Sequence, residues 1–460
     1  MGIIDHHPDT GAPFDPNAQI HLGVFYPGIG AQTVWEDSHA PDQVATDTFV
    51  EVAGTLERGL FDAFFLGDGQ RIRENRGDIL STDIAGRPDA ITQLAALASV
   101  TERIGLVATQ NTTYSIPVEL ARRLASLDAL SDGRAGWNIV TTDNAWTGEN
   151  FRRGGWLEHE RRYERATQVV ELAKQYWAGS PVEFHTDLLE TVAAPNVRSS
   201  VQGRPVLFQA GDSPGGRDLA ARHADVVFSA NNAYDAAVAY AKDLRARTVA
   251  YGRPADAVKI LPGVTVVLGD TEAEAEEKVR WLRSNAHNGV RAIAFLEHYW
   301  GKDLSAYDPE GPLPDIDPVD AELDPSRGTL SIDARTGKLT QIAQWRALSE
   351  EKGLSIRELV LEVSPASRFH SGTPAAVADH WADLVRHRVV DGFNINPYHL
   401  RDAIGDLVDK LVPALQERGV FRTEYTSTTL RGHLGLDGDA ASDRHGRREN
   451  TSRGGREAVA

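Results

Sequence analysis

Neutral polar residues follow two apolar stretches in the segment 104–144, IGLVATQNTTYSIPVELARRLASLDALSDGRAGWNIVTTDN. A strand over 104–109, a polar turn, an amphipathic helix over 118–130 and a strand over 135–141 make a βαβ unit. Parallel α/β folds bind ligands at the carboxyl ends of their strands, and neutral donors and acceptors there can orient a polar heterocycle. The candidate contacts near the two strand ends are Thr112, Thr113, Asn138, Thr141 and Thr142.

A carboxylate stands where the preceding strand ends, in the segment GLFDAFFLGDG (59–69). Asp68 has a glycine on either side, so it could accept a hydrogen bond from an N–H or hydroxyl group of a ligand. It could equally be a turn residue whose oxygens satisfy local backbone donors. The residues alone leave both interpretations open.

Two later motifs could bind an anion. His159 and Tyr163 are four residues apart in HERRYERA (159–166), so they share one face of a helix, where they donate to a ligand or simply make an aromatic contact. The segment QAGDSPGGR (209–217) follows an apolar strand and opens a helix near Gly216. Backbone N–H groups at such a glycine-rich helix start, with the Ser213 hydroxyl, form an anion site that includes Gly211.

The elements that position these residues alternate almost from end to end. The predicted strands cover 20–26, a stretch into Asp68, 104–109, 135–141, 205–210, 225–229, part of 259–268, and 392–396. Helices are predicted between them, with an inserted hairpin or loop over 181–202. Eight strands alternating with helices predict an α/β fold, a TIM (β/α)8 barrel with insertions, the longest between strands 7 and 8. A doubly wound sheet is the alternative, although FYPGIG (25–30) fits its glycine-rich turn poorly.

The domain organisation follows from the same pattern. Residues 1–19 are expected to be a flexible N-terminus, and 20–435 form the barrel, with an insertion at about 285–372. The Pro- and Asp-rich segment 307–326 cannot be a barrel helix, so we interpret it as an excursion over one rim. Residues 436–460 are polar and are expected to be disordered.

Composition excludes several function classes. The 460 residues carry a net charge of −18, which disfavours nucleic-acid binding. There are no cysteines, so disulfides and thiolate chemistry are excluded. No apolar stretch is long enough to span a membrane and no signal peptide is evident, so cytoplasmic residence without membrane association is expected. Phosphate-loop, HExxH and GxSxG motifs are missing, and no histidine spacing indicates a metal site.

Several of these motifs, in this order, resemble the bacterial-luciferase-like FMN-dependent monooxygenases. The resemblance covers about residues 20–435 and is closest to the branch of nitrilotriacetate, dibenzothiophene-sulfone and long-chain alkane monooxygenases and pristinamycin synthase. It is carried by GLFDAFFLGDG, the segment around NTTY, ARRLASLDALSDGRAGWNIVTT, NFRRG with HERRY, PVLFQAGDSPGGR with AARHADVVF, GTPAAVADHWADL, and FRTEYTSTTLRGHLGL.

The resemblance implies a two-component enzyme. Reduced FMN, supplied by a separate NAD(P)H:flavin reductase, would react with O2 to a flavin C4a-(hydro)peroxide that oxygenates a small organic substrate. The implied FMN contacts are Asp68, Thr112, Thr113, Asn138, Thr142, His159, Tyr163, Gly211 and Ser213, with no metal ligand and no assigned catalytic residue. A homodimer is also implied. One departure is Asp212, where the family often has Ser.

A dry pocket would protect the oxygenated flavin from water, and Phe25, Tyr26, Trp137 and Trp146 are its expected lining. Two other functions remain open. The first is a deazaflavin- or NAD(P)-linked oxidoreductase on the same barrel, which would transfer hydride without consuming oxygen. The second is a flavin-binding protein without turnover.

Overall fold

The computed structural model describes residues 8–26, 41–42, 44–70, 74–75, 78–79, 87–141, 151, 157, 159–231, 233–286, 288–318, 338–363 and 369–436. Its main sheet is parallel throughout, with the order β11-β10-β9-β6-β5-β2-β1-β14-β12-β13. The strands are β1 (His21–Tyr26), β2 (Ala63–Leu66), β5 (Gly105–Asn111), β6 (Ala135–Val140), β9 (Val206–Gln209), β10 (Val226–Val227), β11 (Lys259–Ile260), β12 (Gly263–Leu268), β13 (Phe369–Gly372) and β14 (Gly392–Ile395).

The sheet closes on itself where one strand is interrupted. Only Leu261 and Pro262 separate β11, which pairs with β10, from β12, which pairs with β14. Because Pro262 has no N–H, the regular ladder breaks there. The stretch still bonds both neighbours: Gly263 N donates to Ser229 O at 2.9 Å, and Asn394 N donates to Pro262 O at 3.0 Å. Counting β11 and β12 as one strand, the described residues form the predicted eight-stranded barrel, and β13 pairs in parallel beside the last four residues of β12 as an additional strand.

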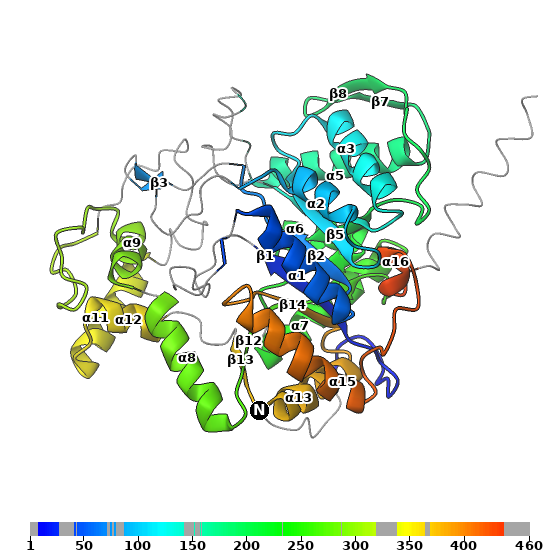
Figure 1. Ribbon diagram of the computed structural model, residues 1–460. Coiled ribbons are helices and arrows are strands. Elements are labelled where there is room, and N and C mark those ends of the chain that lie inside the picture. The colour runs from blue at the N-terminus through cyan, green and yellow to red at the C-terminus, as the bar shows by residue number, and fades with distance from the viewer. Residues whose placement is uncertain are drawn as a thin grey trace, which may run out of the picture.

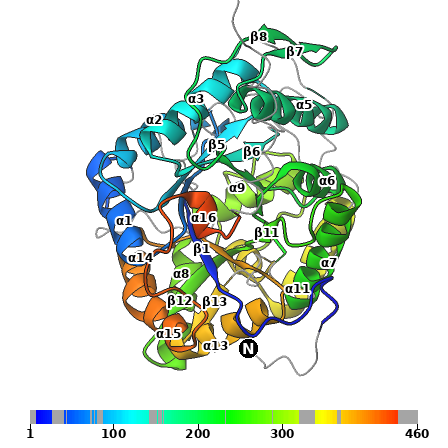
Figure 2. The ribbon, with the colours of Figure 1, turned by 90° about the vertical axis from the view of Figure 1, so that its right-hand side faces the viewer.

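Helices surround the strands in the view along the barrel (Figure 2). They are α1 (Thr46–Arg58), α2 (Ala90–Ala98), α3 (Pro117–Leu130), α5 (His159–Trp177), α6 (Pro214–His223), α7 (Tyr234–Ala250), α13 (Pro374–Arg386), α14 (Asp402–Asp406) and α15 (Val412–Glu417), with a π turn, η3 (Leu407–Leu411), between the last two. Each turns an apolar stripe inward, as in α1, where Phe49, Val52 and Leu56 are buried. The largest hydrophobic cluster lies between this layer and the outward-facing side chains of the strands.

The segment after β12 builds a separate helical unit. It contains α8 (Glu272–Ala286), α9 (Gly289–Trp300), α11 (Lys338–Lys352) and α12 (Ile356–Val363), and the last three share their own hydrophobic cluster. Figure 1 shows α9, α11 and α12 together on the opposite side of the molecule from α16 (Leu430–His433). The described part of the Pro-rich segment, 307–318, forms no helix, as predicted. The long insertion therefore lies between the seventh barrel strand, which ends with β12, and the eighth, β14, as predicted. Its boundaries at 285–372 stay a prediction.

Two smaller predictions can also be compared. The expected hairpin over 181–202 is confirmed by the antiparallel pair β7 (Val182–His185) and β8 (Glu190–Ala193), and β3 (Glu74–Asn75) with β4 (Asp78–Ile79) forms another antiparallel pair. The helix expected to open near Gly216 is present as α6 and begins two residues earlier, at Pro214. Ser213 caps α6 and Pro214 occupies its first turn, where the missing N–H costs nothing.

The C-terminal helix α16 closes the amino-terminal end of the barrel, and Figure 2 shows it over the near end of the strands. Leu430 is fully buried, and a β-carbon placed on Gly105 would lie 2.4 Å from Leu430 Cδ1. Glycine is therefore required where this plug meets the strand. Arg431, next to it, is buried and reaches the Asp225 carboxylate at 3.2 Å.

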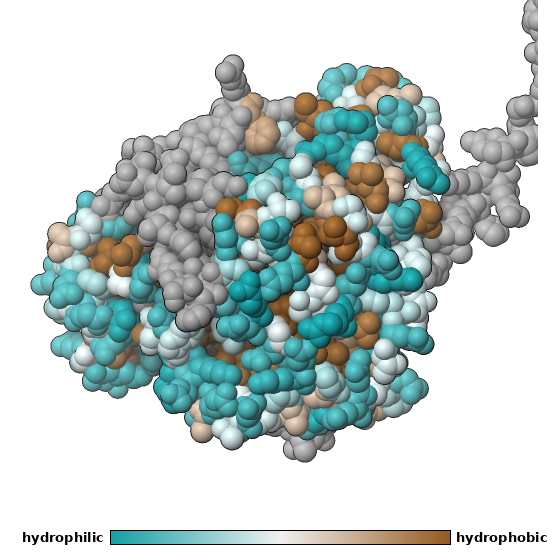
Figure 3. Space-filling view, viewed as in Figure 1, coloured by the Kyte–Doolittle hydropathy of each residue, from teal (hydrophilic) through white to brown (hydrophobic). Residues whose placement is uncertain are grey.

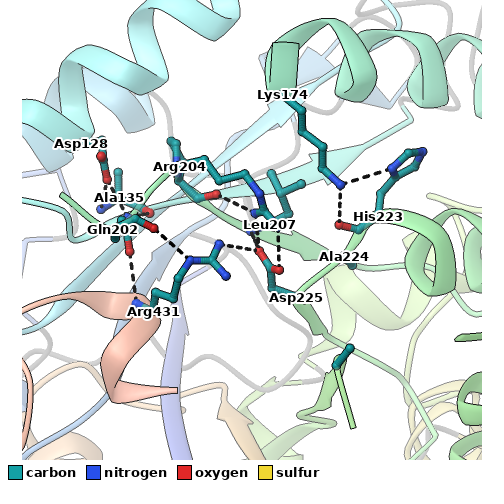
Figure 4. A network of polar contacts seen from close by, with 12 residues as sticks. Asp128, Ala135, Lys174, Gln202, Arg204, Leu207, His223, Ala224, Asp225 and Arg431 are labelled. Carbon is teal, nitrogen blue, oxygen red and sulfur yellow. Dashed lines mark hydrogen bonds and ion pairs between the residues drawn. The ribbon is translucent and has the colours of Figure 1, made fainter. Parts of the chain in front are cut away.

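Asp225 is the centre of the polar network in Figure 4. Arg204 donates to its two oxygens at 2.6 and 2.9 Å, and Leu207 N donates to Oδ2 at 2.8 Å. Burial alone would raise the pKa of Asp225, but Arg204 and Arg431 hold that pKa well below its usual range. Asp225 is therefore charged and fully paired in the interior.

We expect Asp225→Asn to lower the free energy of unfolding by about 3–5 kcal/mol, because Arg204 and the fully buried Arg431 lose the charge that compensates them. Urea unfolding followed by circular dichroism measures this. Asp409→Asn is the matched control, since Asp409 pairs with Arg58 at the surface and its loss is expected to cost less than about 1 kcal/mol. Equal effects of the two substitutions would contradict a structural role for the buried pair.

None of the described helices is long and apolar enough to cross a membrane. On the face drawn in Figure 3, the hydrophobic residues shown in colour form small groups separated by hydrophilic ones.

Candidate functional site

The clearest candidate for an anion site lies where β9 leads into α6. Tyr163 projects from α5, and Ser213 Oγ donates a hydrogen bond to Tyr163 Oη at 3.2 Å. The same Ser213 oxygen accepts from Gly216 N at 3.1 Å, which fixes the hydroxyl at the helix start. Two hydroxyl groups therefore meet at the positive end of the α6 dipole, where anions are stabilised.

Glycines make this close arrangement possible. A β-carbon on Gly211 would lie 2.5 Å from Gln209 Nε2, and one on Gly215 would lie 3.0 Å from Tyr163 Cδ2. A β-carbon on Gly216 would meet the Gly211 carbonyl oxygen at 2.8 Å. Side chains at these positions would push the loop, the helix start and the tyrosine ring apart. The structure thus brings together Tyr163, Gly211 and Ser213, which the sequence predicted as one site.

The carboxylate of Asp212, the residue that departs from the family pattern, is bonded to a neighbouring loop. Its Oδ2 accepts a hydrogen bond from Ala230 N at 2.8 Å, so the carboxylate reaches across to the loop that follows β10. Arg217 Nε donates to the Asp212 carbonyl oxygen at 3.0 Å, and Arg217 Nη1 pairs with Asp243 at 3.0 Å. Asp212 therefore anchors the loop after β9 to the loop after β10.

Asp68 lies two residues beyond β2 and is partly buried. Its Oδ1 accepts from Gln70 N at 3.0 Å, and its Oδ2 accepts from Ala90 N at 3.3 Å at the start of α2. Burial, opposed by these backbone hydrogen bonds, raises the pKa of Asp68. The structure thus gives Asp68 the local turn role that the sequence left open, and its contact with a ligand stays a prediction.

The neutral polar candidates lie after β5 and in β6. They differ in whether their polar atoms already have a hydrogen-bond partner. Thr112 Oγ1 donates to Val140 O at 3.3 Å. Thr113 Oγ1 and Asn138 Oδ1 are buried and have no hydrogen-bond partner among the described residues. Buried polar atoms without a partner are costly, so these two atoms indicate a bound group or water. The Asn138 amide nitrogen donates to Thr109 Oγ1 at 3.1 Å, which aims the side chain.

Asn138 points into the barrel because side chains alternate along a strand. Its neighbours Trp137 and Ile139 belong to the cluster under the helices, and Trp137 meets Trp177 of α5 edge to face at 6.3 Å. The alternation corrects the expected pocket lining. Tyr26 and Trp137 face the helix layer, where Tyr26 packs on Phe49 at 5.5 Å, so neither lines the barrel interior.

Phe25, by contrast, faces the interior as expected. Its ring lies 4.7 Å from that of Phe65 and 5.3 Å from that of Phe228, and Phe65 lies 5.9 Å from Phe208. Phe25, Phe65 and Phe208 lie in three different strands and Phe228 directly follows β10, and the four rings form an apolar floor inside the barrel. Sequence reasoning named only Phe25 among these four residues, although the other three stand in or directly after apolar strands.

Arg165 is a site residue that the sequence analysis missed. It is buried on α5, two residues after Tyr163, and its Nε donates to Thr112 O at 2.9 Å. A second nitrogen donates to Ser115 O at 3.3 Å and a third to Leu188 O. Arg165 therefore joins the helix that carries Tyr163 to the loop that carries Thr112 and Thr113. The signal available in the sequence was its place in HERRYER, one turn after Arg161 and Arg162.

Three predicted residues cannot be placed. Thr142 and Trp146 lie outside the described residues, and so does the side chain of His159, whose backbone begins α5.

The site therefore combines an anion cradle, neutral polar side chains and an apolar floor at the carboxyl ends of the strands. A profile described as "Luciferase-like monooxygenase" matches residues 28–391. This chain belongs to the luciferase-like monooxygenase family. N-acetyl-S-(2-succino)cysteine monooxygenase of Bacillus subtilis (strain 168) is 38% identical, over 91% of this chain and 97% of that protein.

Other members support the branch that the sequence indicated. Nitrilotriacetate monooxygenase component A of Aminobacter aminovorans is 37% identical over the same shares. The crystal structure of DmoA from Hyphomicrobium sulfonivorans superposes with a TM-score of 0.75 at 26% identity, over 96% of this chain and all of that one. One of the chains of pristinamycin IIA synthase, dibenzothiophene-sulfone monooxygenase and long-chain alkane monooxygenase also match. The predicted family, barrel fold and enzyme class, a luciferase-like monooxygenase, are thereby confirmed.

Proposed function

We propose that this protein is the oxygenase component of a two-component monooxygenase that uses reduced FMN and O2 to oxygenate a small organic substrate. The observation that carries the proposal is the cradle of Tyr163, Ser213 and the glycine-rich start of α6, beside buried unpartnered atoms of Thr113 and Asn138. A flavin mononucleotide has the two parts that such a site requires, a terminal phosphate and a neutral polar ring system.

The residues present fit FMN in a definite order. Tyr163, Ser213 and the backbone of the α6 start would hold the phosphate, because they gather donors at a helix N-terminus. Thr113 Oγ1 and Asn138 Oδ1 would meet the polar edge of the ring or its ribityl chain, because burial leaves them in need of a partner. Bound reduced FMN supplies the electrons that activate oxygen.

The protein itself orients the cofactor and excludes water. The rings of Phe25, Phe65, Phe208 and Phe228 close the barrel beneath the site, and α16 seals the opposite end. Such a floor keeps bulk water from reaching the reacting atoms from below. The helical unit of α9, α11 and α12 lies on the other side of the molecule from α16 (Figure 1), so the substrate pocket would be shaped from that side.

Further parts of the proposal concern partners. A separate NAD(P)H:flavin reductase would supply the reduced FMN, because the names of two relatives describe them as one part of a larger monooxygenase or synthase. A homodimer and cytoplasmic residence belong to the proposal as well. A hydride-transferring or non-catalytic protein on the same barrel is not favoured, because relatives 34–39% identical over most of the chain are named as monooxygenases or as part of a synthase.

Rapid mixing tests the reaction type. The protein is loaded with reduced FMN under anaerobic conditions and mixed with oxygenated buffer while flavin absorbance is followed. We expect oxidised flavin to appear more slowly than in a protein-free control, with a separate intermediate spectrum, as the predicted C4a-(hydro)peroxide requires. Reoxidation at the rate of free flavin, both alone and in the presence of trial substrates, would contradict the monooxygenase proposal.

The phosphate assignment is tested by Tyr163→Phe and Ser213→Ala. Each is expected to weaken reduced-FMN binding by roughly 1–3 kcal/mol, because each removes a hydrogen bond to a charged group. Tyr251→Phe is the control, since it removes a tyrosine hydroxyl that bonds Asp218 at the protein surface. Anaerobic titration measures the affinities. If both cradle variants bind as tightly as the control, the phosphate does not lie there.

Asp68 requires a control of its own because it contacts the start of α2. We expect Asp68→Ala to weaken FMN binding, whereas Asp89→Ala, which removes the N-cap of the same helix, lowers only the melting temperature. Titration and thermal unfolding of both variants separate the two roles. If the two variants have the same FMN affinity and the same melting temperature, Asp68 serves only as a turn residue.

A further inference from the structure

Gln70 has an unusual backbone conformation for a residue other than glycine. Its φ is +56°, in the left-handed region that residues other than glycine rarely adopt. Three other non-glycine residues in the described chain share this feature, namely Leu60, Asp132 and Arg388. Each of these three lies just past the end of a helix, where one left-handed residue is the ordinary way to terminate it. Gln70 follows β2 and ends no helix.

The left-handed residue connects a predicted ligand contact, Asp68, to the end of the neighbouring strand β5. Gln70 N donates to Asp68 Oδ1 at 3.0 Å, so its backbone is tied to the carboxylate after β2. Its side-chain oxygen accepts a hydrogen bond from Asn111 Nδ2 at the end of β5. The left-handed conformation thus lets one residue hold the ends of two neighbouring strands.

Asn111 connects Gln70 to the next loop through a second hydrogen bond. It is buried, and its Oδ1 accepts from Tyr114 N at 2.8 Å, closing a turn around Thr112 and Thr113. The far side of that turn is held by Arg165, which donates to Thr112 O at 2.9 Å from the helix that carries Tyr163. The unpartnered Thr113 hydroxyl is therefore aimed by a turn fixed at both ends.

We propose that Gln70 is a positioning residue for the flavin, held in a left-handed conformation so that its side-chain amide fixes Asn111 and, through it, the turn that presents Thr113. Strain of this kind persists where surrounding contacts over-determine it, and it is typical of ligand sites. The inference rests on the proposed function, because it assigns Gln70 to the binding of reduced FMN.

Gln70→Gly is the decisive variant because it removes the side chain and the backbone strain together. If Gln70 served stability alone, binding would be unchanged and the melting temperature would fall, because the hydrogen bond to Asn111 is lost. We expect the dissociation constant for FMN to increase about tenfold, the effect of losing one well-placed hydrogen-bonded contact, while the melting temperature does not fall.

Two further variants complete the design. Asp132→Gly relieves the same backbone conformation at the end of α3, outside the site, and is expected to leave FMN affinity within about twofold of the unmodified protein. Gln70→Glu keeps an oxygen that accepts from Asn111 and is expected to retain most of the affinity. Loss of affinity in Gln70→Gly, retained in the other two, supports the proposal. Unchanged affinity in Gln70→Gly overturns it.

Amide hydrogen exchange gives a readout that needs no flavin. We expect faster exchange at Tyr114 N–H in Gln70→Gly than in the unmodified protein, because Asn111 no longer has its partner. If the unmodified protein fails to bind FMN, the proposed function falls, and exchange still decides whether Gln70 orders the turn. If FMN binds and neither exchange nor affinity responds to the substitution, only the role of Gln70 is wrong.

Discussion

Three buried aspartates at the amino-terminal ends of strands hold the barrel together. Asp62, Asp225 and Asp391 each precede a strand, and each accepts a hydrogen bond at 2.7–2.9 Å from a backbone N–H of the adjacent strand. Each also faces arginine, and charge pairing lowers the pKa of all three against the opposing effect of burial, for Asp62 to about 2. Charged groups this deep must keep their partners, so the strand starts and the C-terminal plug with Arg431 are fixed in one register.

The amino-terminal end of the barrel is rigid, and the candidate ligand contacts lie at the carboxyl ends of the strands. There the strand-end loops are linked by hydrogen bonds in sequence, from Asp68 through Gln70 and Asn111 to the Thr112–Thr113 turn, and on through Arg165 to α5. Tyr163 continues the series to Ser213 and α6. Five of the predicted contacts, namely Asp68, Thr112, Thr113, Tyr163 and Ser213, thus belong to one connected series of loops and helix starts. Preorganisation of this kind suits a cofactor whose ring and phosphate must be held at once.

Sequence reasoning located the motifs but misjudged where some side chains point. Tyr26 and Trp137 were expected in the pocket because they are aromatic and near strand ends, yet both pack under the helices. A shift of one position along a strand moves a side chain to the opposite face. Strand ends predicted only to within one or two residues therefore do not show which face a side chain takes. The start of α6 lies two residues before Gly216 for a different reason, because Ser213 caps the helix and Pro214 occupies its first turn.

The sequence by itself determined the alternation of strands and helices, the family and the motifs around Asp68, Thr113, Tyr163 and Ser213, because local periodicity, capping residues and motif order are written in contiguous residues. The tertiary structure alone decided that Pro262 interrupts the strand closing the barrel, that Leu430 plugs its lower end, and that Gln70 reaches Asn111. These contacts join residues far apart in the chain. Their existence depends on strand register and on which face each side chain takes, and both are set only when all eight strands pack together.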